Sequence, residues 1–158
     1  MPDRLTHLGE EGRLQMVDVG AKDQTARLAR VRGEIRMAPE TARLIADNKV
    51  EKGSVFEAAR LAGIMAAKRT GDLIPLCHPL NLTSVALDFV VGEDRIEVEA
   101  ETRINDRTGV EMEALVAAST ALLTNYDMCK GVDRGMVISE VRLMEKRGGR
   151  SGTWVREG

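Results

Sequence analysis

Several absences narrow what this chain can be. The 158 residues include two cysteines, Cys77 and Cys129, and two thiols do not make the disulfide framework of a small secreted protein. Aromatic residues make up 3%, too few for a surface that stacks single-stranded nucleic acid. No apolar run approaches the roughly 20 residues of a membrane helix, and residues 1–10 lack the apolar stretch of a signal peptide. We therefore expect a cytoplasmic protein that binds neither membrane nor nucleic acid.

Neither sign of charge dominates. The sequence has 23 Lys and Arg against 25 Asp and Glu, a formal net charge of −2, so any anion site must arise from local clustering. Apolar residues at 43% and charged residues at 30% are ordinary for a globular protein. The length favours a single domain over residues 1–158. Within it we expect an extended arm at 1–24 and a Gly-rich basic tail at 145–158.

Alternating polarity predicts the strands. Period-two patterns cover residues 29–37, 84–91 and 96–104, and residues 92–94 link the last two of these as a hairpin. A last strand is expected at 136–143. Helical patterns cover three further segments. A short helix at 39–47 begins with a proline, which suits a first turn.

The two longer helices are predicted from capping signals. Ser54 and Glu57 fit a capping box that opens a helix to about residue 68, with Gly71 as its stop. Its apolar stripe comprises Ala58, Leu61, Ala62, Met65 and Ala66. Thr108 and Glu111 fit a second box that opens a helix to about residue 130.

The resulting order is strand, helix, helix, strand, strand, helix, strand. Without the short first helix this is βαββαβ, the ferredoxin-like arrangement. We therefore predict an α+β fold, an antiparallel sheet with helices on one face, plus a short extra helix toward the N-terminus.

A first candidate site lies in Leu76, Cys77 and His78. Pro75 and Pro79 restrict the backbone on both sides and hold these side chains in a fixed presentation. A histidine on a stiff loop suits proton transfer near neutral pH. The alternative is a buried turn with a hydrogen-bonded histidine.

Charged pairs at the two ends of the last helix are further candidates. Asp127 and Lys130 share one helix face, either as a surface ion pair or as a tuned acid–base pair at a cleft. Glu111 and Glu113 diverge by about 200°, so a carboxylate dyad is not expected. One can cap the helix while the other faces a ligand, such as the N–H edge of a guanine.

The basic residues fit either a polyanion pocket or a solvated surface. They are Arg27, Lys52, Lys68, Arg69, Lys146, Arg147 and Arg150. The glycines of 148–152 could wrap a phosphate with backbone N–H groups, although the P-loop lysine is missing. Cys77, His78 and Cys129 offer at most three soft ligands without metal-site spacing, so we predict no metal site.

Taken together, these strings resemble one family over about residues 5–152, that of molybdenum cofactor biosynthesis protein C. They are Met16-Val-Asp-Val19, Lys52-Gly53, Ala62-Gly63-Ile64, Ala66-Ala-Lys-Arg-Thr70, Leu73-Ile-Pro-Leu-Cys-His-Pro-Leu80, Thr108-Gly-Val-Glu-Met-Glu-Ala-Leu115 and Tyr126-Asp-Met-Cys-Lys130. The resemblance implies a ferredoxin-like lyase that converts 3′,8-cyclo-7,8-dihydroguanosine 5′-triphosphate into cyclic pyranopterin monophosphate and diphosphate. It also implies a homohexamer, a trimer of dimers with active sites at the dimer interfaces.

The same resemblance assigns residue roles. Asp127, Lys130 and Lys52 match catalytic positions. The residues that match substrate-binding positions are Leu76, Cys77, His78, Met112, Glu113, Glu111 and Arg27. To these we add the other candidate cations Lys68, Arg69, Lys146 and Arg150. Arg150 stands where lysine is common, and arginine binds phosphate but cannot donate a proton near neutral pH.

The implied chemistry needs no redox step and therefore no cofactor, and no obligatory metal. For this chemistry, we expect the proximity of Asp127 and Lys130 to shift their pKa values toward neutrality. We also expect nearby cations to stabilise the departing diphosphate. Two alternatives stay open from the residues alone. One is a non-catalytic nucleotide-binding module, and the other is a structural oligomer whose polar motifs are caps.

Overall fold

The computed structural model describes residue 9 and residues 12–158, so the arm histidine His7 lies outside the described residues. Five strands form one antiparallel sheet in the order β2-β3-β1-β4-β5. The strands are β1 (Thr25–Arg36), β2 (Ser84–Val91), β3 (Arg95–Asp106), β4 (Val137–Arg147) and β5 (Trp154–Val155). Within the described residues, no helix is both long enough and apolar enough to cross a membrane.

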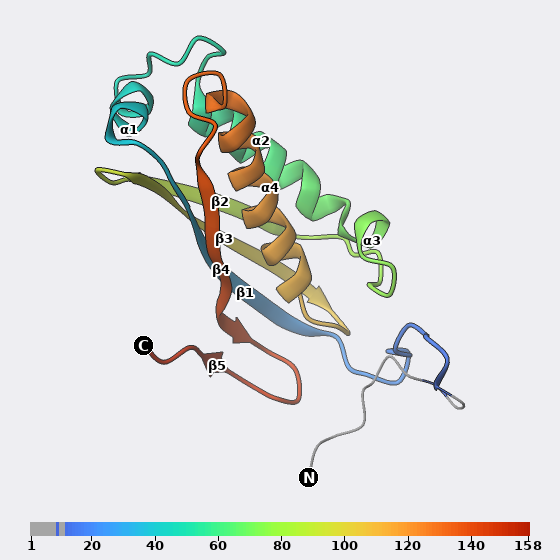
Figure 1. The fold of residues 1–158 in the computed structure, drawn as a ribbon. Helices are drawn as coiled ribbons and strands as arrows, with labels where there is room; N and C mark the ends of the chain where they lie inside the picture. The colour runs from blue at the N-terminus through green and yellow to red at the C-terminus, as the bar shows by residue number, and fades with distance from the viewer. Residues whose placement is uncertain (1–8, 10–11) are drawn as a thin grey trace.

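The helices pack on one face of this sheet (Figure 1). They are α1 (Pro39–Ala46), α2 (Val55–Lys68), the single turn α3 (Thr70–Leu73) and α4 (Glu111–Cys129). The core lies between α2, α4 and the sheet, where Ile35, Ile96 and Leu122 are fully buried. The predicted α+β, ferredoxin-like arrangement is confirmed, and the short helix predicted at 39–47 is found at Pro39–Ala46.

The C-terminal segment departs from the prediction. β4 continues to Arg147, and β5 pairs with it through Glu145↔Val155 and Lys146↔Trp154. Residues 145–147 and 154–155 are therefore strand, although we expected tail throughout. A two-residue exposed strand has too few positions to show a period, so the alternation rule had nothing to detect.

The apolar stripe predicted for α2 does not coincide with the buried face of the helix. The buried positions are Val55, Ala59, Gly63 and Ala67, whereas Leu61 is 60% exposed and Met65 is 45% exposed. The reason is close packing, because a Cβ on Gly63 would lie 2.6 Å from Leu87 Cδ2 and 3.0 Å from the Ala117 carbonyl oxygen. Small residues face inward because α4 and β2 leave no room for larger side chains.

Helix starts are simpler than the predicted capping boxes. Ser54 Oγ does accept the Glu57 N–H at 3.4 Å, but the Glu57 carboxylate pairs with Arg60 rather than reaching back. The second box is wrong, because α4 begins at Glu111 after Val110, with no side-chain cap. Gly71 lies inside α3 and does not stop α2.

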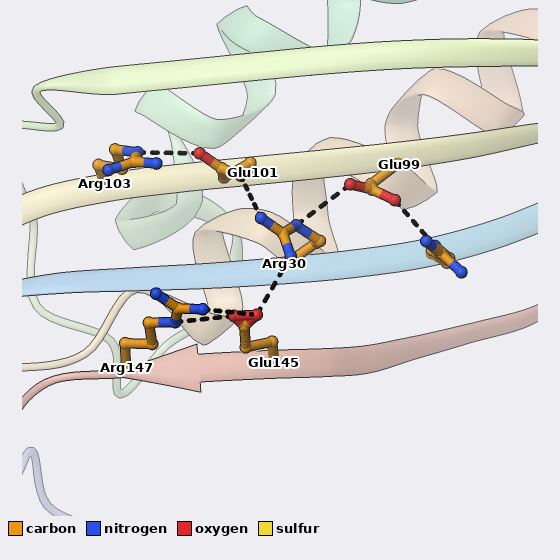
Figure 2. Close-up of polar contacts among 7 residues, drawn as sticks. Arg30, Glu99, Glu101, Arg103, Glu145 and Arg147 are labelled. Atoms are coloured by element: carbon orange, nitrogen blue, oxygen red, sulfur yellow. Dashed lines mark hydrogen bonds and ion pairs between the residues drawn. The ribbon is translucent and has the colours of Figure 1, made fainter. Parts of the chain in front are cut away.

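The sheet face away from the helices carries an ion-pair network (Figure 2). Arg30 on β1 lies 3.1 Å from Glu99, 2.9 Å from Glu101 and 3.1 Å from Glu145. Each of these glutamates also meets a second arginine, and those arginines are Arg32, Arg103 and Arg147. The network therefore ties β1, β3 and β4 together by charge on the face that the helices leave open.

Candidate functional site

The three predicted catalytic residues meet at the C-terminal end of α4. Asp127 lies on the last turn, and its carboxylate is 3.1 Å from Lys130 Nζ and 3.6 Å from Lys52 Nζ. Lys52 comes from the loop between α1 and α2 and also donates to the Asp127 backbone carbonyl at 2.9 Å. Two ammonium groups from different segments therefore converge on one carboxylate.

The electrostatics of this cluster differ from the expectation. The hydrogen bond from Lys130, followed by the charge of Lys52, holds the pKa of Asp127 below its usual range. The shift is away from neutrality, because both neighbours are cations and favour the charged carboxylate. Asp127 is thus an ionised base or counter-ion at neutral pH, and the ammonium groups are the available proton donors.

The loop after α4 fixes this end of the molecule to α1. Asp133 accepts the Ala38 N–H and the Thr41 hydroxyl, both at 2.9 Å, and so caps α1 from a distant part of the sequence. These hydrogen bonds lower the pKa of Asp133. Tyr126 donates its hydroxyl to the Arg134 carbonyl at 2.9 Å. The middle of the loop is therefore held both to α1 and to the last turn of α4.

A second group of predicted residues borders a hollow of about 270 Å³ at the opposite end of α4. The loop after α3 supplies Leu76, Cys77 and His78, and the first turn of α4 supplies Glu111, Met112 and Glu113. Both glutamates line this hollow although the helix separates their directions. Val17, Val19 and Lys22 of the arm also contribute to its wall.

Glu113 is the most perturbed group of this hollow. Its side chain is 3% exposed, and burial, with a smaller contribution from the charge of Glu111, raises its pKa to about 7. Burial also raises the pKa of the Cys77 thiol. At neutral pH, Glu113 can give or take a proton, whereas Cys77 is a thiol and not a thiolate nucleophile.

Two further hollows adjoin the first. One, of about 440 Å³, is bordered by Lys68, Arg69 and Asp106 and shares Leu80 with the first hollow. The other, of about 430 Å³, is bordered by Arg27, Arg150 and Lys22, which also lines the first hollow. Asp72 and Asp106 balance the two cations of the former hollow, whereas Asp23 is the one acid beside the three cations of the latter.

The tail closes part of this region. Arg27 Nε donates to the Asp106 carbonyl at 3.1 Å, and Lys146 Nζ donates to the Gly148 carbonyl at 3.1 Å and to Ser151. Gly148 and Gly149 have φ of 94° and 78°, which favour glycine, and a Cβ on either would collide with residues 26–27. Lys146 therefore shapes the turn that presents Arg150.

The two groups stay apart within one chain. Glu113 and Asp127 are separated by about 21 Å along the helix, at 1.5 Å rise per residue. One subunit does not bring His78 and Asp127 to a common hollow. The buried Cys129 lies at the C-terminal end of α4, whereas Cys77 lies beside the first turn of that helix. Among residues 9 and 12–158, no three His, Cys, Asp or Glu side chains gather to hold a metal ion.

Sequence reasoning missed three arm residues that line the site. Val17, Val19 and Lys22 border the first hollow, whereas the sequence pattern predicts only an extended arm at 1–24. A signal was present, because Val17 and Val19 alternate with exposed Met16 and Asp18. Two apolar residues are too short a pattern to stand out in a segment of low periodicity.

Comparison with known proteins gives independent evidence on the family to which the chain belongs. Residues 16–149 match the model of the MoaC family. A cyclic pyranopterin monophosphate synthase of Desulforapulum autotrophicum is 57% identical over 96% of this chain and 94% of its own. Proteins of the same name from Roseiflexus sp. and Streptomyces coelicolor are 57% and 54% identical, over 97% and 98% of this chain and 98% and 91% of their own.

Proposed function

Because the chain belongs to the MoaC family, we propose that it catalyses the reaction named in its relatives, the synthesis of cyclic pyranopterin monophosphate. The substrate is 3′,8-cyclo-7,8-dihydroguanosine 5′-triphosphate, diphosphate is the second product, and the enzyme is a cytoplasmic phosphorus–oxygen lyase. The observation that carries this proposal is the convergence of Lys52 and Lys130 on Asp127, within the Tyr126–Lys130 string that resembles the family.

The residues divide the work by charge. Ring rearrangement needs protons moved between nitrogen and oxygen atoms, and Asp127 accepts them while Lys52 and Lys130 donate them. In the phosphate step, a hydroxyl of the substrate gives its proton to Asp127 and its oxygen bonds to the α-phosphorus, while the bond from the α-phosphorus to the oxygen that bridges to the β-phosphate breaks. The electron pair leaves with diphosphate, whose growing negative charge the lysines stabilise.

The other residues bind and orient the substrate. Carboxylates such as that of Glu113 accept hydrogen bonds from N–H groups of the guanine-derived ring, which lies beside His78 and Cys77. The cations of the adjoining hollows, Arg27 and Arg150 among them, hold the triphosphate. The arginine at position 150 serves for charge and not for proton donation.

A second copy of the chain completes each site in this proposal. Met112, Val116, Thr120, Leu123 and Asp127 follow one stripe of α4 away from the core, and no charged residue lies between Glu113 and Asp127. Leu123 is 59% exposed in the single chain. Packing the uncharged part of this stripe, from Met112 to Leu123, against itself and antiparallel about Thr120 brings the first turn of one α4 beside the last turn of the other. Each pair of chains then has two complete sites, and three pairs give the expected hexamer.

The first experiment tests the reaction. The purified chain is incubated with the cyclic dihydro-GTP, and pterin and diphosphate are followed by mass spectrometry. Asp127→Asn and Lys130→Ala should keep the oligomer intact and stop conversion. Asp47→Asn, which changes an exposed carboxylate after α1, serves as the control and should convert at the normal rate. Conversion at the normal rate by both site variants would overturn the roles assigned here.

The second experiment tests the shared site. His78→Ala and Asp127→Asn change opposite ends of α4, and each alone should be inactive. Co-refolded as mixed oligomers, they should regain about one quarter of the activity, because half of the isologous pairs are mixed and each of those has one intact site. Two differently tagged Asp127→Asn chains, mixed in the same way, should stay inactive. Confirmed mixed oligomers without activity would contradict the shared site.

A further inference from the structure

Residues 17–22 of the arm form a defined wall beside the substrate hollow. Val17 and Val19 are half-buried and line it, whereas Asp18 and Gly20 are exposed. The shape of the segment is held locally, because Asp18 accepts the Gly20 N–H at 2.8 Å and Val19 accepts the Lys22 N–H at 3.0 Å. The segment therefore has a specific conformation where it meets the hollow.

Lys22 occupies the junction between two hollows of opposite character. It lines the hollow that contains Glu111 and Glu113, and it also lines the hollow that contains Arg27 and Arg150. The second hollow is lined by three cations, Lys22, Arg27 and Arg150, and by one acid, Asp23. A ligand with a hydrogen-bonding ring and an anionic chain would lie with its ring toward the glutamates and its chain toward the arginines, passing Lys22.

The ammonium group of Lys22 is available for such a ligand. Within the part of the chain that the structure describes, its side chain makes no hydrogen bond or ion pair. Three other site lysines are engaged, with Lys52 and Lys130 on Asp127 and Lys146 on the tail turn. An exposed, unpaired cation at the boundary of an acidic and a basic hollow matches an anion supplied by a ligand.

We propose that residues 17–22 are a substrate-binding segment in which Lys22 binds the phosphate chain where it leaves the ring. Val17 and Val19 cover the ring side of the hollow and keep water from it. This inference rests on the proposed function for the identity of the ligand, a nucleoside triphosphate derivative. It adds to the site a segment that the sequence pattern had left without a role.

The test separates binding from chemistry. Lys22→Met should raise KM for the cyclic dihydro-GTP on the order of tenfold, the loss of one charge-assisted contact, with a smaller change in kcat. Inhibition by added inorganic diphosphate should weaken by a similar factor. Lys22→Arg should restore both values, and Arg43→Met, which removes an exposed cation on α1, should leave both unchanged. Normal KM and normal diphosphate inhibition in Lys22→Met would overturn the proposal.

Calorimetry with inorganic tripolyphosphate distinguishes this failure from failure of the proposed function. If the unmodified chain converts nothing yet binds tripolyphosphate, and Lys22→Met binds it about tenfold more weakly, the segment is a phosphate-binding element and only the reaction is wrong. If the two chains bind tripolyphosphate equally, the assignment of Lys22 is wrong whatever the reaction.

Discussion

We predict that the buried carboxyl of Glu113 lowers the stability of the folded chain above neutral pH. Burial raises its pKa from 4.5 to about 7, which corresponds to about 3 kcal/mol between the folded and unfolded chains. For an acid with a raised folded pKa, the folded chain keeps a proton that the unfolded chain releases between these two values. The free energy of unfolding therefore falls as pH rises from 4.5 to 7, and the full cost is present above pH 7.

Glu113→Gln removes this titration and keeps the shape of the side chain. At pH 8 the variant should be more stable by about 3 kcal/mol, a rise in Tm of roughly 6–12 °C for a chain of this size. At pH 4.5 the two proteins should melt together. The measurement is thermal unfolding by calorimetry at half-unit steps from pH 4.5 to 8.5, with substrate conversion followed in parallel.

Glu93→Gln, in the exposed turn between β2 and β3, controls for the loss of one negative charge. Its melting curve should follow that of the unmodified chain at every pH. If Glu113→Gln also follows that curve, the carboxyl is not desolvated in the folded protein and the argument fails. If stability rises and conversion falls together in Glu113→Gln, the buried acid is kept for function at the expense of stability.

Two further predictions concern parts of the fold outside the hollow. Asn125 is fully buried, and neither atom of its amide has a partner among the described residues; Asn125→Leu should therefore stabilise the chain by about 1–3 kcal/mol in thermal unfolding, and a lower Tm would refute this. Arg30→Met should destabilise the sheet by roughly 1–3 kcal/mol, since it leaves Glu145, 9% exposed, with one partner fewer. Arg32→Met, at a side chain 58% exposed, should cost less than 1 kcal/mol; equal effects in denaturant unfolding would contradict this account of the network.

The sequence was sufficient for the strands of the core because their alternation is long. The pattern of residues 96–104 survives as the inward face of β3, where Ile96, Val98 and Ala100 are buried. The sequence was insufficient for α2, because apolar periodicity identifies a face of the helix but does not show how much room the neighbouring elements leave for its side chains. Leu61 and Met65 were the larger apolar residues, yet Gly63 and Ala59 fit the narrow gap against α4 and β2.

Capping could be predicted only where the cap is local. Ser54 precedes the residues it caps, so its role follows from spacing alone. Asp133 caps α1 from about 90 residues away in sequence, a contact that only the fold creates. The same limit applies to the pKa of Asp127, because the pair with Lys130 follows from helix spacing but the second cation, Lys52, arrives through tertiary structure.

Predicting which residues form the site is a different problem from predicting how those residues are arranged in space. Family resemblance supplied the residues, and their chemistry is consistent with proton transfer and phosphate release. Yet a helix of 19 residues holds its ends about 28 Å apart, so no side-chain motion within one chain can unite His78 with Asp127. In the proposed dimer, a second α4 packs antiparallel along the uncharged middle of this helix, which brings His78 of one chain close to Asp127 of the other. The absence of charge between Glu113 and Asp127 is therefore as much a part of the proposed site as the charges that flank it.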